Sequence, residues 1–149
     1  MDFGRLQRGE YIGFVGVGIL LASLFLTWFE TSPDNENAQI NGETGEFNAF
    51  DTYGTLDWLL VAACLAPFIL AWIVIRSHEV GWNRGELTAI LGFSSLLLVI
   101  LNGIILGQPG TVEVSLQWGY PVAVLASVGI LMSGALRQYE AMEKQPPGV

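Results

Sequence analysis

Three polar side chains at the edges of long apolar stretches are the best candidates for chemistry in this chain. Glu30 follows the first apolar stretch, Asp57 precedes the second, and Asn102 lies near the end of the third. A polar or ionisable group at the edge of hydrocarbon is costly unless it has a task, such as binding a cation or relaying a proton. We therefore take these three residues as a candidate polar site near the outer leaflet of a membrane. The alternative is that both carboxylates reach water and that Asp57 only interacts with a helix N-terminus.

Other residues with reactive side chains are scarce. The single cysteine, Cys64, lies in the middle of an apolar stretch, where a thiol behaves as a small inert hydrophobe. The single histidine, His78, cannot complete a zinc or haem site by itself. The sequence has no glycine-rich phosphate loop, no His-Glu-x-x-His pair and no Gly-x-Ser-x-Gly elbow. We expect neither an enzyme nor a bound cofactor or metal.

The composition indicates what kind of structure must position these residues. Of 149 residues, 52% are hydrophobic and 13% are charged, whereas about a quarter of the residues of a soluble domain are charged. The 6 basic residues are outnumbered by 14 acidic ones, which argues against a nucleic-acid partner, because that partner requires clustered Lys and Arg. The composition excludes the common soluble classes and predicts an integral membrane protein whose first partner is the lipid bilayer.

Four apolar stretches approach or reach the length of about 20 helical residues that crosses a bilayer. None of them contains Asp, Glu, Lys or Arg, and backbone groups in hydrocarbon must be paired within a helix. We therefore predict an all-α fold, a four-helix transmembrane bundle that forms one integral membrane domain over residues 1–149. The expected spans are 11–29, 58–75, 87–106 and 118–136, with outer loops 30–57 and 107–119, an inner loop 76–86 and an inner tail 137–149.

The basic residues predict the orientation of this bundle. They occur only in alternate segments, at Arg5, Arg8, Arg76, Arg84, Arg137 and Lys144. Lys and Arg mark the cytoplasmic side of a membrane, so we expect both termini in the cytoplasm. The first span is longer than the apolar region of a signal peptide and lacks a cleavage site of small residues, so we expect it to be retained.

Both outer loops carry signals for short strands. Asn41-Gly42 favours a type I′ turn between residues 38–40 and 43–47. Residues 111–118 alternate between polar and apolar types, which is typical of a half-buried strand. One arrangement is a small antiparallel β cap formed by the two outer loops. The other is a solvated loop followed by an early start of the last span.

Small residues recur at helical spacing in or beside three of the expected spans. Such residues allow two helix backbones to approach closely, either within the chain or between two copies of it. The candidate packing positions are Gly9, Gly13, Gly18, Ala22, Gly92, Ser95, Gly129 and Ser133.

Several short motifs resemble those of a broad group of small, uncharacterised four-span membrane proteins that are common in actinobacteria. The matching residues are Phe47-Asn48-Ala49-Phe50, Asp57, Pro109-Gly110, Leu116, Gly119-Tyr120, Gly129 and Gly134. Those proteins tend to carry Trp where this chain has Phe47. The resemblance implies a bacterial inner membrane and no known activity.

With no catalytic motif and with substantial outer loops, we expect a non-enzymatic accessory or assembly subunit. It would bind other membrane proteins, or a second copy of itself, through its helix faces and outer loops. The alternative is a small transporter or channel subunit that uses Glu30, Asp57 and Asn102 as a polar pathway. In either case we expect a multi-pass protein of the bacterial inner membrane.

Overall fold

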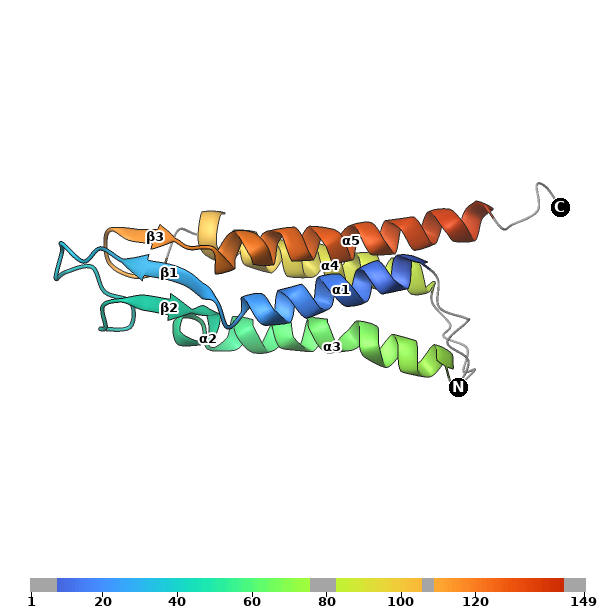
Figure 1. Ribbon diagram of the computed structural model, residues 1–149, viewed down its shortest axis with the longest axis horizontal. Helices are drawn as coiled ribbons and strands as arrows, with labels where there is room; N and C mark the ends of the chain where they lie inside the picture. The colour runs from blue at the N-terminus through green and yellow to red at the C-terminus, as the bar shows by residue number, and fades with distance from the viewer. Residues whose placement is uncertain (1–7, 76–82, 106–108, 144–149) are drawn as a thin grey trace.

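The computed structural model describes residues 8–75, 83–105 and 109–143. Long helices lie side by side, with a small sheet at one end and the N-terminal end of α1 and the C-terminal end of α5 at the other (Figure 1). The elements are α1 (Arg8–Ser23), β1 (Thr27–Thr31), β2 (Glu46–Asn48), α2 (Ala49–Thr52), α3 (Thr55–Ile75), α4 (Arg84–Ile100), the π-helical turn η2 (Leu101–Ile105), β3 (Val114–Leu116) and α5 (Gly119–Glu143).

The prediction of a four-helix transmembrane bundle is wrong. Within the described residues, two helices are long and apolar enough to cross a membrane by length and composition, Gly85–Ile105 and Gly119–Glu143. Helix α1 has 16 residues, which is about 24 Å of helix against a hydrocarbon core of about 30 Å. In α3, the apolar helix found among the described residues is the shorter stretch Thr55–Ala66.

The first expected span, residues 11–29, is not one continuous helix, because its last third lies beyond the end of α1. After α1 ends at Ser23, the chain turns, and the next residues of the expected span form strand β1. The aromatic side chains of Trp28 and Phe29 are fully buried there, and the Trp28 Nε1 donates a hydrogen bond to the carbonyl oxygen of Ser23 at 2.7 Å. Aromatic and β-branched residues favour strands, and an apolar composition alone does not distinguish burial in protein from exposure to lipid.

A three-stranded antiparallel sheet has the strand order β2-β1-β3. We call this sheet, together with α2 and the loop residues 32–45 and 109–113, the cap. Thr27 is paired with Asn48 of β2, and Phe29 with Leu116 of β3. The alternating stretch 111–118 therefore does contain a strand. This strand, β3, pairs with β1 and not with the expected hairpin of the first outer loop, because the central strand comes from the end of the first apolar stretch.

The Asn41-Gly42 pair forms the expected type of tight turn on a much shorter hairpin. Both residues have positive φ, 54° at Asn41 and 85° at Gly42, as a type I′ turn requires. The turn is closed by one isolated bridge, in which Ile40 and Glu43 exchange backbone hydrogen bonds of 2.9 and 3.0 Å.

Close helix packing depends on several of the predicted small residues. A Cβ added to Gly92 would lie 2.3 Å from the Leu131 backbone nitrogen, and one added to Gly13 would lie 2.7 Å from the Ser133 Oγ. At Gly9 the nearest atom would be the Arg137 Cγ, at 2.5 Å. These positions bring α1 and α4 against α5.

The remaining predicted packing positions divide between the interior and the surface. Ser95 and Ser133 are buried in the helix bundle. Ala22 is exposed, and a Cβ added to Gly18 or Gly129 would meet nothing within 4 Å. These three positions therefore lie on outward helix faces.

Candidate functional site

Two of the three predicted polar residues each interact with Tyr53, where the cap joins the helices. Asp57 lies in the first turn of α3 and is 1% exposed. Asn102 is half-buried in the π-helical turn η2. Tyr53, in the connection between α2 and α3, donates a hydrogen bond from its hydroxyl to the backbone carbonyl oxygen of Asn102. We call Tyr53, Asp57, Asn102 and Tyr120 the cap junction.

The end of α4 and the π-helical turn that follows it supply carbonyl oxygens to the two tyrosines of the cap junction. The Tyr120 hydroxyl donates to the Val99 carbonyl oxygen at 2.7 Å, one turn before the Asn102 carbonyl that Tyr53 contacts. The absence of a side chain at Gly103 makes this possible, because a Cβ there would lie 2.2 Å from the Tyr120 ring. Short π-helical segments occur frequently at functional sites. Sequence reasoning missed both tyrosines as site residues.

Aromatic contacts connect the cap junction to the central strand of the sheet. The Trp28 ring lies edge-on to Tyr120, with 5.5 Å between ring centroids, and edge-on to Tyr53 at 6.3 Å. Phe29 packs edge-on against Tyr53 at 5.8 Å. Such pairs stabilise a fixed ring geometry beyond the burial of their area. The position of Tyr53 is therefore coupled to that of β1.

The carboxyl group of Asp57 is buried, and no hydrogen bond from the described residues replaces its lost hydration. Neither of its oxygens has a hydrogen-bond partner among the described residues. Burial raises the pKa of the Asp57 carboxyl to about 7; its own backbone N–H lowers this pKa, and the negative charge of Asp51 raises it. Burial, followed by the charges of Tyr120 and Asp57, also raises the pKa of Tyr53. The site therefore favours a neutral acid over a carboxylate.

Glu30, the third predicted residue, belongs to a different surface. It is half-buried in β1, and its Oε2 accepts a hydrogen bond from the Gln117 Nε2. Within residues 8–75, 83–105 and 109–143, no hydrogen bond joins Glu30 to Asp57 or Asn102. Glu30 instead lines a groove of about 670 Å³ in the cap, together with Thr31, Ser32, Pro33, Asp34, Glu113, Val114 and Ser115.

Metal binding finds no support in the part of the chain that the structure describes. That part holds no group of three or more His, Cys, Asp or Glu residues arranged around a common point. His78 lies outside the described residues, as do Arg5, Arg76 and Lys144. Cys64 is buried in α3 as a free thiol.

A buried ion pair at the opposite end of the helices was also missed by sequence reasoning. The Arg137 Nη2 lies 2.9 Å from the Glu10 Oε1, and the Arg137 Nη1 donates a hydrogen bond to the Thr88 Oγ1 at 3.2 Å. Helix α5 continues to Glu143, past the expected end at residue 136, and this holds Arg137 on the inner face of the bundle. The three side chains connect α1, α4 and α5.

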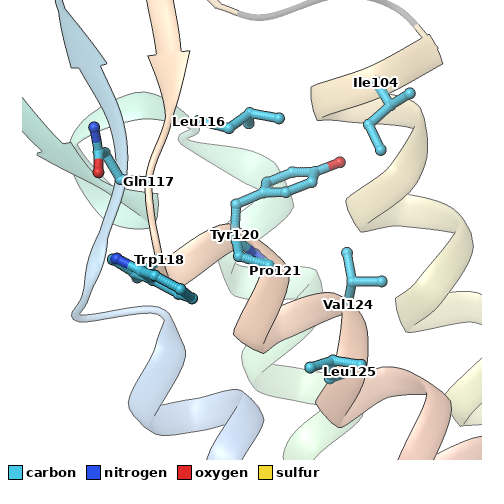
Figure 2. Close-up of a pocket in the computed structure, with 8 residues that line it drawn as sticks. All are labelled: Ile104, Leu116, Gln117, Trp118, Tyr120, Pro121, Val124 and Leu125. Carbon is cyan, nitrogen blue, oxygen red and sulfur yellow. The ribbon is translucent and has the colours of Figure 1, made fainter.

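An apolar groove of about 570 Å³ lies beside the cap junction (Figure 2). The Tyr120 ring points toward Ile104 of η2, and Trp118 directly precedes α5. Trp118 is 80% exposed. The lining residues are Ile104, Leu116, Gln117, Trp118, Tyr120, Pro121, Val124 and Leu125. Such a lining can accept an apolar group.

Comparisons with protein-family models, with curated proteins and with solved structures find no match for this chain. The part of the chain that the structure describes is mostly helical with a small β cap, and two of its helices are long and apolar enough to cross a membrane.

Proposed function

We propose that the protein is a non-enzymatic, membrane-embedded accessory or assembly subunit that binds another membrane protein or a second copy of itself. The observation that carries this proposal is the outward face of the helices, which is lined by large apolar side chains. Val15 of α1 is 62% exposed, Trp58 of α3 69%, and Leu125 of α5 71%. Soluble monomers rarely expose extensive apolar patches, whereas lipid and a partner helix cover them.

We further propose a multi-pass arrangement in a bacterial inner membrane with both termini in the cytoplasm. Arg8 at the start of α1, Arg84 at the start of α4 and Arg137 near the end of α5 all belong to the end of the bundle away from the cap (Figure 1). Basic residues are retained on the cytoplasmic side. Residues 27–52 and 109–118, which include the cap strands, contain no Lys or Arg. The resemblance to actinobacterial membrane proteins supports the same location.

Fractionation and purification test this proposal in sequence. We expect the protein to stay in the membrane pellet after an alkaline carbonate wash. After extraction in a mild detergent, native mass spectrometry should give a particle of defined stoichiometry heavier than one 16.2 kDa chain. Release of the chain by carbonate, or a strictly monomeric particle without a second chain, would overturn the proposal.

Outward-facing small residues provide variants that separate partner binding from folding. Gly18→Leu and Gly129→Leu place a large side chain where the chain itself leaves space. If these faces meet a partner, both variants should retain their thermal stability while the heavier particle is lost. Ile19→Leu is the matched control on α1, because it keeps the volume of an exposed apolar side chain. Retention of the heavier particle in both glycine variants would exclude these faces from binding.

A second candidate function, a small transporter or channel subunit, is favoured by one observation. The oxygens of Asp57 are buried without a hydrogen-bond partner among the described residues, and its charge acts on Tyr53, which donates a hydrogen bond to Asn102 in the π-helical turn. Liposomes containing the purified protein would then show proton or cation flux that Asp57→Asn and Asn102→Leu abolish and that Asp34→Asn retains. Liposomes without flux, or a flux that both substitutions leave unchanged, would eliminate this candidate.

A further inference from the structure

Asp57 lies on the inward face of α3 together with apolar residues. Leu60 and Cys64 follow it at helical spacing and are fully buried. Leu56, beside it, is 8% exposed and belongs to the apolar core that also contains Trp28 and Tyr120. A carboxylate in such surroundings loses its hydration, which is costly unless a cation or several hydrogen-bond donors replace the water.

The described residues around Asp57 supply no positive charge. The ionisable group whose charge acts on it is Asp51 of α2. The charges of Asp57 itself and of Tyr120 of α5 act in turn on Tyr53 in the α2–α3 connection. All of them are acids. The basic residues of the described ranges are Arg8 at the start of α1, Arg84 at the start of α4 and Arg137 near the end of α5, at the end of the bundle away from the cap.

The helices that pack against α3 add no counter-charge near Asp57. The ionisable residues of α1 and α4 all fall within the first few positions of these helices, at the end away from the cap. They are Arg8, Glu10 and Tyr11 on α1 and Arg84 and Glu86 on α4. Because the described residues offer Asp57 no counter-charge, its ionised form requires water to enter the cap junction.

We propose that Asp57 is a proton-binding site that controls how tightly the cap is held on the helices. With the proton bound, the neutral acid is compatible with the closed junction. When the proton leaves to solvent, water must reach the carboxylate, and it does so by separating the Tyr53 hydroxyl from the Asn102 carbonyl. Because Tyr53 packs against Trp28 and Phe29, this separation loosens β1 and the strands paired with it.

This switch does not depend on which partner the protein binds. It requires only that the cap exchange between a held and a loosened state, and the raised pKa of Asp57, about 7, places the exchange near neutral pH. The charge of Asp51 contributes in the same direction, because a second negative charge disfavours the carboxylate. Acidic conditions should therefore favour the held cap.

Infrared spectroscopy and hydrogen exchange on the full chain in a mild detergent test the proposal. The carboxylic-acid carbonyl band of Asp57 should be present at pH 5.5, absent at pH 8.5 and missing from Asp57→Asn. Over the same range, the protection factors of residues 27–31 and 46–52, corrected for the intrinsic exchange rate, should fall about ten-fold or more in the wild type. Asp57→Asn should retain its protection at both pH values. Residues 123–133 of α5 are the internal reference and should not change.

Asp34→Asn is the matched control, because it makes the same chemical change at an exposed position of the cap; it should behave like the wild type. If Asp57→Asn does not fold, the infrared band and the protection factors of the wild type alone test the proposal. An unchanged band between pH 5.5 and 8.5, or a loss of protection without a change in the band, overturns the proposal. A band that appears at pH 5.5 only after sodium is replaced by N-methylglucamine would assign the site to a metal cation, and would also overturn it.

Discussion

The guanidinium of Arg137 and the carboxylate of Glu10 form an ion pair, with 2.9 Å between Nη2 and Oε1, inside the end of the helix bundle that lies away from the cap. Each residue is 7% exposed, so solvent screens the pair little. The hydrogen bond from Arg137 to Thr88 extends the contact to a third helix. This end of the bundle is thus connected by charge, whereas the cap junction is connected by tyrosine hydroxyls and aromatic packing.

Removing one member of this ion pair should destabilise the protein strongly. Glu10→Gln leaves the Arg137 charge buried without its carboxylate partner, which costs about 3–5 kcal/mol in comparable cases. The free energy of unfolding in a mild detergent, measured by denaturant titration, should fall by that amount. The double variant Glu10→Met/Arg137→Met removes both charges and should lie closer to the wild type. Equal stabilities of Glu10→Gln and the wild type would show that the pair contributes little.

Glycine at position 92 should be required for the approach of α4 to α5. Gly92→Ala places a Cβ 2.3 Å from the Leu131 backbone nitrogen, and backbone cannot rotate away as a side chain does. We expect overpacking to cost about 1–3 kcal/mol, seen as a lower melting temperature. Gly129→Ala is the matched control on an open face, where alanine should raise stability by up to about 1 kcal/mol through its helix propensity. A melting temperature of Gly92→Ala at or above that of the wild type would contradict the observed helix spacing.

Local sequence signals predicted the parts of the fold that depend on local physics. The apolar stretches that become α4 with η2 and α5 are long enough to be recognised by length alone. Asn41-Gly42 adopts the positive φ angles of its turn type, and the alternation around Val114 marks a strand. Each of these signals is contained within a few neighbouring residues.

Contacts between distant segments were not predictable in this way. Trp28 and Phe29 are as apolar as a lipid-facing pair, so composition did not reveal that they form the central strand of a sheet. The link from Tyr53 to Asn102 depends on a π-helical turn, which no short pattern indicates. Asp57 was selected from the cost of burying an acid, and that physical argument required no knowledge of its neighbours.

Stability should depend on pH through Asp57 with a definite sign. An unfolded chain releases this proton near the ordinary pKa of 3.8, and the folded chain near about 7. Between these values the unfolded state binds fewer protons, so stability falls as pH rises and levels off above about 7. Asp57→Asn has no such proton to lose. Its melting temperature relative to the wild type should therefore increase from pH 4 to pH 7. A constant difference across this range would contradict the buried, unpaired state of the acid.

Loss of the Tyr53 hydroxyl should weaken the cap junction without altering its packing. Tyr53→Phe keeps the ring contacts with Trp28 and Phe29 but removes the donor to the Asn102 carbonyl oxygen. A hydrogen bond of this kind contributes about 0.5–1.5 kcal/mol, and the unfolding free energy measured in a mild detergent should fall within that range. Tyr139→Phe makes the same change at a position that is 66% exposed, and it should leave the unfolding free energy unchanged. If the two variants are equally stable, the hydroxyl does not hold the α2–α3 connection to the π-helical turn.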